Sequence, residues 1–232
     1  MLELFPTGFE EVDLSGGGIE LVAYTDAAGE EQLWHLFGGT RAQDVEDGWE
    51  DRWRTFHRPV RVGSLWVGPP WEEPPAEALA VVIDPGRAFG TGAHPTTRLS
   101  LELLQSIERG SLLDIGCGSG VLSIAAARLG FGPILGIDVE EPAIEATLAN
   151  AAANGVEVDA RLADAFGERL PRTDVAVANI SLADVERLQL AASRLVTSGY
   201  LASDRASVAG YRWADRREVD GWAADFHLHE SG

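Results

Sequence analysis

A glycine loop framed by two apolar strands limits the fold of this chain more than any other feature. The loop spans 114–120, Asp-Ile-Gly-Cys-Gly-Ser-Gly, and the apolar Leu112 and Leu113 precede it. A helical stretch follows at once, and a second predicted strand over 133–138 ends on Asp138. This order is typical of a nucleotide site, where glycines let the backbone approach the ligand and the strand-end acid binds ribose hydroxyls.

The spacing of the glycines favours one kind of nucleotide. The dinucleotide fingerprint Gly-x-Gly-x-x-Gly accepts a pyrophosphate, whereas Gly116, Gly118 and Gly120 are spaced Gly-x-Gly-x-Gly. An acid at the strand end, Asp114, would repel phosphate and attract a cationic ligand. S-adenosyl-L-methionine is a nucleoside with a sulfonium and an ammonium but no phosphate. We therefore expect this cofactor, and the spacing disfavours a nicotinamide oxidoreductase.

Strand-like and helix-like segments alternate downstream of residue 76. The predicted strands are 80–83, 111–115, 133–138, 156–162 and 174–179, and the predicted helices are 96–108, 120–129, 141–153 and 181–191. Alternation of this kind predicts an α/β fold with a doubly wound parallel sheet and helices on both faces.

Turn and cap residues refine this pattern. Thr96 is expected to cap the first of these helices, and Ser181 with Asp184 is spaced as a cap pair for the last. Two strand-like runs, 211–219 and 222–228, are separated by Asp-Gly, which is a hairpin signal. The hairpin predicts an antiparallel edge on the parallel sheet.

Three regions are expected along the chain. Residues 1–58 resemble a small acidic α+β domain for substrate recognition, with a strand at 19–24 and a short helix at 30–37. The segment 59–75 is rich in proline and tryptophan and is expected to be an ordered linker. Residues 76–232 would form the cofactor-binding domain.

The charge of the chain limits the kinds of molecule that it is expected to bind. The formal net charge is −19 at pH 7, and residues 1–51 hold thirteen acidic residues against a single basic one, Arg41. Nucleic-acid binders usually carry a basic face, so a direct nucleic-acid partner is not expected, whereas a basic protein is favoured. No run reaches the roughly 18 apolar residues of a membrane helix. The single cysteine, Cys117, fits a reducing cytoplasm and is too isolated for a metal site.

Further motifs identify a family. They are 84–97 (Asp-Pro-Gly-Arg-Ala-Phe-Gly-Thr-Gly-Ala-His-Pro-Thr-Thr), the glycine loop, 136–138 (Gly-Ile-Asp) and 177–180 (Val-Ala-Asn-Ile). Together they resemble the ribosomal protein methyltransferases that trimethylate protein eleven of the large subunit, over about residues 45–230. Ser198-Gly199 stands where that family has Ser-Gly at the end of its fifth strand.

The resemblance implies a seven-stranded, Rossmann-like class I methyltransferase fold. It also implies S-adenosyl-L-methionine as cofactor and methylation of lysine or α-amino groups on a basic ribosomal protein. Members of the family usually carry a longer N-terminal recognition domain. A methyltransferase acting on another protein or on a small molecule is therefore the alternative, and a cofactor-binding scaffold without activity is disfavoured by the intact Asn179.

Roles for individual residues follow. Asn179 is the expected catalytic residue, because its amide oxygen can accept a hydrogen bond from the incoming amine; the alternative is a turn-forming Asn. Asp164 resembles the acid that binds the adenine amine, with Phe166 packing on the ring, and a solvent-facing loop acid is an equal alternative. Thr97 resembles a cofactor-contacting threonine, although helix capping would also explain it. The expected cofactor-binding set is Phe89, Thr97, Asp114, Gly116, Gly118, Asp138, Asp164 and Asn179, with no metal ligand.

Overall fold

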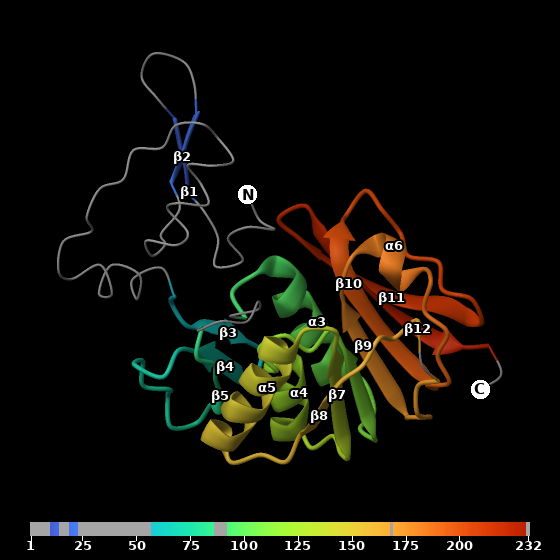
Figure 1. Cartoon of the computed structure of the whole chain (residues 1–232), viewed down its shortest axis with the longest axis horizontal. Helices are drawn as coiled ribbons and strands as arrows, with labels where there is room; N and C mark the ends of the chain where they lie inside the picture. Colours follow the sequence, from blue (N-terminus) through green and yellow to red (C-terminus); the bar gives the residue numbers. More distant parts are fainter. Residues whose placement is uncertain (1–9, 14–18, 23–56, 86–91, 168, 231–232) are drawn as a thin grey trace. The chain divides into compact units, whose positions relative to one another are not determined.

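The structure is a computed structural model that describes residues 10–13, 19–22, 57–85, 92–167 and 169–230 (Figure 1). The chain divides into two compact units, Met1–Phe56 and His57–Gly232. In the first unit, β1 (Glu10–Asp13) pairs antiparallel with β2 (Ile19–Val22). The strand predicted at 19–24 is thus confirmed, and the helix predicted at 30–37 lies outside the described residues.

A seven-stranded sheet forms the body of the second unit (Figure 1). Its strands in chain order are β6 (Leu112–Ile115), β7 (Ile134–Asp138), β8 (Asp159–Leu162), β9 (Val175–Asn179), β10 (Arg194–Leu201), β11 (Tyr211–Val219) and β12 (Trp222–His229). Their order in space is β11-β12-β10-β9-β6-β7-β8. The five strands from β8 to β10 are parallel, and β12 and β11 add an antiparallel edge. The predicted fold class, including the edge hairpin, is confirmed.

This strand order creates a switch point beside β6. From β6 the chain moves outward through β7 and β8, and it then crosses back to place β9 on the other side of β6. The connections on the two sides of β6 therefore leave in opposite directions. Ligands of such sheets bind at the carboxyl ends of the strands where the order reverses.

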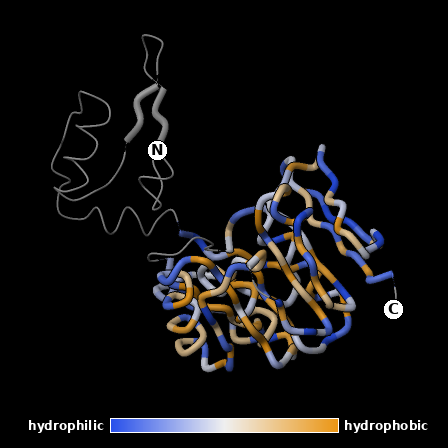
Figure 2. The backbone as a smooth tube through the Cα atoms, turned by 45° about the vertical axis from the view of Figure 1, so that its right-hand side comes forward, coloured by the Kyte–Doolittle hydropathy of each residue, from blue (hydrophilic) through white to orange (hydrophobic). Residues whose placement is uncertain are grey.

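Helices and loops cover both faces of the sheet. The first face packs against α3 (Pro95–Ser106), α4 (Val121–Arg128) and α5 (Glu141–Asn154). The opposite face packs against α6 (Leu182–Val185) and the chain that follows it. In Figure 2 the central strands are mostly coloured as hydrophobic, in agreement with their burial. None of the helices within the described residues has the length and apolar character of a membrane span.

Two predicted helix boundaries are wrong. The helix predicted at 181–191 ends after one turn, at Val185. Leu188 is also buried, and the chain then leads into β10. Its predicted cap is confirmed, since Ser181 Oγ accepts the backbone N–H of Asp184. The cap of α3 is His94, two positions before Thr96, because Pro95 occupies the first helical position.

The predicted linker contains two strands. β3 (Val60–Val62) and β4 (Leu65–Gly68) form an antiparallel hairpin, and β4 pairs parallel with β5 (Leu79–Val82). Residues 60–68 of the predicted ordered linker therefore form regular strands, which the sequence analysis did not expect. That prediction was based on the many prolines and tryptophans of 59–75. In the structure, Leu65 and Val67 of β4 are buried in the hydrophobic core. β5 joins this three-stranded sheet and not the seven-stranded one.

Candidate functional site

Three strand ends meet at the switch point. β6, β7 and β9 are parallel neighbours, so their carboxyl ends lie at one edge of the sheet. β6 leads into the glycine loop, β7 ends on Asp138 and β9 ends on Asn179. The structure thus brings together residues that lie more than sixty positions apart in the sequence, as the strand pattern predicted.

The glycine loop needs its glycines. Gly116, Gly118 and Gly120 have φ values of 73°, 54° and 81°, in the left-handed region that side chains rarely adopt. A Cβ at Gly116 would stand 2.7 Å from Ile180 Cγ2, and a Cβ at Gly120 would stand 3.0 Å from the backbone of Thr147. The loop is therefore held between the end of β9 and helix α5, and its backbone faces the edge of the sheet without Cβ atoms at these positions.

Asp138 fixes the loop from the β7 side. Its Oδ2 accepts the backbone N–H of Gly118 at 3.0 Å, and its Oδ1 accepts that of Glu140 at 3.1 Å. The half-buried carboxylate therefore joins the glycine loop to the start of α5. Each carboxylate oxygen keeps a further lone pair that can accept a ligand hydroxyl.

Asp114 lies beneath the loop. Its side chain is buried, and Oδ2 accepts a hydrogen bond from Ser123 Oγ at 2.7 Å. Oδ1 has no hydrogen-bond partner in the part of the chain that the structure describes. Burial raises the pKa of this carboxyl to about 6, while the bond from Ser123 opposes the shift. The sequence did not indicate that this acid would be covered.

Helix α5 supports the loop through polar side chains that the sequence analysis missed. Thr147 Oγ1 donates to the carbonyl of Gly118 at 3.0 Å, and Asn150 Nδ2 donates to that of Ser119 at 2.9 Å. Asn154 reaches the backbone of Val82 in the smaller sheet. The available signal was a row of polar residues at 147, 150 and 154 in a helix rich in alanine, at the spacing of one helical face.

Cys117 is closed off inside the same loop. Its side chain is buried, and its sulfur lies 3.4 Å from Thr147 Oγ1. Burial raises the pKa of the thiol to about 12, and the charge of Asp114 adds to the effect. A thiol held protonated in this way is a poor nucleophile, so Cys117 acts here as a small packing residue.

Asn179 is oriented by a residue of α3. Its Nδ2 donates to Thr97 Oγ1 at 3.3 Å, and the hydroxyl of Thr97 is buried with the rest of that side chain. The next backbone N–H, that of Ile180, donates to the carbonyl of Ser198 at 3.1 Å. The amide of Asn179 is thus held between two elements, β9 and α3, that are far apart in the sequence.

His94 has a structural environment. Its Nδ1 lies 2.8 Å from Thr96 Oγ1 and accepts the backbone N–H of Thr96, and its ring meets that of Trp222 edge-on at 4.8 Å. Burial lowers the pKa of the imidazole. These contacts hold the start of α3 and fit the cap assignment.

Asp164 and Phe166 follow β8 near the same edge. The backbone N–H of Ala163 donates to the carbonyl of Asp138 at 2.9 Å, which holds this turn beside the end of β7. Asp164 Oδ1 accepts the N–H of Phe166 at 2.9 Å, and Arg187 lies over the Phe166 ring at 4.1 Å. Phe89, which completes the predicted set, lies outside the described residues.

A family model and the individual relatives that match this chain carry the same family description. The model of the family "Ribosomal protein L11 methyltransferase (PrmA)" matches residues 21–208. Ribosomal protein L11 methyltransferases of Shewanella sediminis and Pseudomonas putida (strain W619) are 42% and 45% identical over 171 and 168 residues. These alignments cover 70% and 69% of this chain and 58% and 57% of the relatives. The chain thus spans somewhat more than half the length of the curated relatives it matches.

Solved structures share the fold. The ribosomal protein L11 methylase of Lactobacillus delbrueckii subsp. bulgaricus superposes with a TM-score of 0.62 at 22% identity, over 75% of this chain and 99% of that one. A tRNA (uracil-54, C5)-methyltransferase of Pyrococcus abyssi, solved with S-adenosyl-L-homocysteine, gives a TM-score of 0.51 at 18% identity, over 74% and 44% of the two chains. At these identities the likeness concerns the fold alone, and that fold is the one described above.

Proposed function

The chain belongs to the ribosomal protein L11 methyltransferase family, and from this membership we propose that it transfers methyl groups from S-adenosyl-L-methionine to amino groups of ribosomal protein L11. The observation that carries the proposal is the position of Asn179. Its side-chain amide stands at the end of β9, beside the glycine loop, with its orientation set by Thr97.

The described residues fit the cofactor. The loop offers backbone without Cβ atoms at Gly116 and Gly118, which suits close approach of the methionine part. Asp138 stands at the end of β7 with lone pairs for ribose hydroxyls. The unpartnered Oδ1 of Asp114, buried under the loop, supplies negative potential toward an ammonium and a sulfonium. We assign Asp164 to the adenine end and Thr97 to the neighbourhood of Asn179.

Asn179 would position the substrate amine. When bound, the cofactor supplies a methyl group already activated on a sulfonium. The chain therefore contributes mainly orientation, which is worth several kcal/mol in well-aligned reactions. With Nδ2 directed to Thr97, the amide presents Oδ1 as an acceptor for an N–H of the substrate amine. That hydrogen bond fixes the direction of the nitrogen lone pair.

The amine has to be neutral when it reacts. Deprotonating a lysine at pH 7 costs roughly 4–5 kcal/mol from its reference pKa near 10.4. Entry into a site beside a cationic group lowers that pKa, so solvent can accept the proton. Among the described residues at this edge, His94 is committed to the cap of α3, and we assign no general base.

The acidic N-terminal residues would attract the substrate. Residues 1–51 carry thirteen acidic residues and one basic residue, a formal charge of −12. Such a field raises the rate of encounter with a basic ribosomal protein and weakens with added salt. We propose that residues 1–58 serve recognition and that residues 76–232 serve methyl transfer.

Intact-mass analysis tests the proposal directly. Purified L11 is incubated with the chain and S-adenosyl-L-methionine, with a second basic ribosomal protein as comparison and the low-turnover variant Asn179→Ala as control. The proposal expects mass increments of whole methyl groups on L11 only. If S-adenosyl-L-homocysteine binds but L11 is not methylated, the assignment of the cofactor stands and the assignment of L11 as substrate is overturned. Loss of both would overturn the proposal.

A further inference from the structure

The peptide after Asn179 is held between two glycines. The side chain of Ile180 lies over Gly116 of the β6 loop. Its backbone lies against Gly199 of β10, where a Cβ would collide with the carbonyl of Ile180. The N–H of Ile180 also donates to Ser198, next to Gly199. The position of Asn179 therefore depends on the shape of β10 at Gly199.

β10 carries an irregularity at this point. Ser198 pairs with Ala224 and Tyr200 with Ala223, so Gly199 is an extra residue in the pairing with β12. Gly199 has a φ of 106°. An extra residue leaves the ladder locally unpaired, and other contacts have to fix the backbone there.

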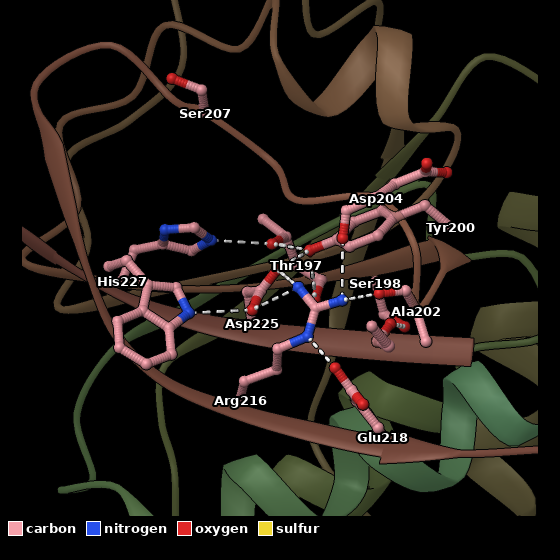
Figure 3. Close-up of polar contacts among 12 residues, drawn as sticks. Thr197, Ser198, Tyr200, Ala202, Asp204, Ser207, Arg216, Glu218, Asp225 and His227 are labelled. Atoms are coloured by element: carbon pink, nitrogen blue, oxygen red, sulfur yellow. Dashed lines mark hydrogen bonds and ion pairs between the residues drawn. The ribbon is translucent and has the colours of Figure 1, made fainter. Parts of the chain in front are cut away.

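Side chains on both sides of Gly199 provide these contacts (Figure 3). Ser198 Oγ donates to the carbonyl of Ala223 at 2.7 Å. Across the extra residue, Thr197 Oγ1 and the Tyr200 hydroxyl lie 2.7 Å apart. The same hydroxyl donates to Asp225 Oδ2 on β12 at 3.0 Å. Tyr200 thus joins the two ends of the bulge to the neighbouring strand.

A buried charge pair holds Asp225 in place (Figure 3). Arg216 on β11 approaches both carboxylate oxygens at 3.1 and 3.3 Å, and Trp213 Nε1 donates to Oδ1 at 3.0 Å. Asp225 is fully buried, and the side chain of Arg216 is 9% exposed. His227 completes the network with a contact of 3.0 Å to Thr197 Oγ1. Well-satisfied buried networks of this kind rigidify their surroundings.

We propose that Tyr200 is a positioning residue for methyl transfer. Its hydroxyl contacts Thr197 and Asp225 and so holds the Gly199 bulge. The bulge holds the backbone of Ile180 and thereby places Asn179, whose side-chain amide Thr97 orients. The inference rests on the proposed function for its link to catalysis. The mechanical part, from Tyr200 to Ile180, stands on the described contacts alone and can be tested without substrate.

The test variant is Tyr200→Phe, which removes only the hydroxyl. Tyr211→Phe is the matched control, because Tyr211 is also a buried tyrosine of this sheet, and its hydroxyl binds the backbone of Ala192 away from Ile180. Tyr200→Phe should lower kcat about tenfold, as expected for about 1.4 kcal/mol of lost transition-state stabilisation. The affinity for S-adenosyl-L-homocysteine should stay within about twofold, because the substitution disturbs the position of Asn179 and removes no contact with the cofactor. Tyr211→Phe should leave kcat unchanged.

Amide hydrogen exchange provides a readout that is independent of activity. In Tyr200→Phe the amide of Ile180 should exchange faster than in the parent chain, whereas that of Gly116, bonded to Ile137, should not change. Thr197→Val removes the other end of the hydroxyl contact and should act in the same direction. If Tyr200→Phe fails to fold, Thr197→Val replaces it as the test variant.

Three outcomes would overturn the inference. One is an unchanged Ile180 exchange rate and kcat in both Tyr200→Phe and Thr197→Val. A second is an equal loss of kcat in Tyr200→Phe and Tyr211→Phe, which would indicate a general effect on folding. A third is a full further loss when Tyr200→Phe is added to Asn179→Ala, because a residue acting through Asn179 should add little in that background. If the parent chain fails to methylate L11, the proposed function fails while the exchange data still decide the mechanical link.

Discussion

The side-chain amide of Asn179 donates a hydrogen bond to the hydroxyl of Thr97, 82 positions earlier in the chain, at 3.3 Å. The bond crosses from the end of β9 to the first turn of α3. It gives Thr97 a role that neither helix capping nor direct cofactor contact describes. The hydroxyl of Thr97 takes up Nδ2 of the amide, and under the proposed function Oδ1 is then the atom offered to the substrate amine.

Replacing Thr97 by valine should therefore reduce turnover. The substitution keeps the shape of the side chain and removes the hydroxyl, so the loss should be about 0.5–1.5 kcal/mol, or roughly a 2- to 13-fold lower kcat. Ser100→Ala is the control, because Ser100 is buried on the same helix and its hydroxyl donates within that helix, to the carbonyl of Thr96. Steady-state kinetics on both variants separate the two effects. Equal losses would point to α3 as a whole.

Asp138→Ala should weaken binding of S-adenosyl-L-homocysteine by about 1.5–3 kcal/mol, because a charge-assisted acceptor for the ribose is lost. Calorimetry measures the change. Asp174→Ala is the matched control, since Asp174 also accepts a backbone N–H, that of Ser111, but at the opposite end of β9. An affinity that is unchanged in Asp138→Ala would leave this acid as a support for the loop only.

Asp114 predicts an unusual dependence of stability on pH. Its folded-state pKa, about 6, lies above its ordinary value of 3.8, so the native state holds its proton more tightly than the unfolded state. The stability that this carboxyl contributes is therefore present in acid and lost as the pH rises through about 4 to 6, by about 3 kcal/mol in total. Asp114→Asn should gain that amount relative to the parent chain between about pH 4 and pH 7.

Denaturant unfolding of both proteins across this range checks the prediction for Asp114. The difference between the two proteins cancels the opposite effect of His94 and His227, whose pKa values are lowered by burial and whose contributions are lost in acid. A difference that stays constant with pH would show that Asp114 does not titrate in this range.

Two adjacent arginines should differ sharply in their effect on stability. Arg216→Met leaves Asp225 buried without its cation, which should cost about 3–5 kcal/mol. Arg217→Met breaks an ion pair with Asp215 and a hydrogen bond to the carbonyl of Arg216. The side chains of Arg217 and Asp215 are 39% and 45% exposed, so the loss should be about 1 kcal/mol or less. Thermal unfolding of the two variants measures both values. Similar losses would mean that the buried pair contributes no more than a surface pair.

Much of the sheet could be predicted from the sequence, because β6, β7 and β9 are mostly apolar runs that end at a glycine, an acid and an asparagine. The turn Asp220-Gly221 also fixes the register of the last hairpin and places Arg216 opposite Asp225. The burial of that pair was not predictable in the same way. It depends on the segment after β10, whose carbonyls at Ala202 and Asp204 accept from the arginine.

The sequence could predict which strand ends form the site. It could not predict the hydrogen bonds that hold the glycine loop in place. Apolar patterns place Asp138 and Asn179 at one edge, because parallel strands share their carboxyl ends. The patterns say nothing of Thr147 or Asn150, whose contacts depend on how α5 lies against the loop. For the same reason the cover over Asp114 escaped the sequence analysis, since it comes from Ser123 and the closed packing of α4.

The buried thiol of Cys117 allows the opening of the glycine loop to be measured by chemical labelling. It is the single cysteine of the chain and lies inside the loop that we assign to the cofactor. A thiol reagent can reach it only after the loop opens, so the rate of labelling reports how often this part of the fold opens. A ligand that binds the closed loop must slow that rate in proportion to its occupancy. Occupancy of the site can therefore be followed by thiol labelling of the parent chain, without a substrate and without an engineered cysteine.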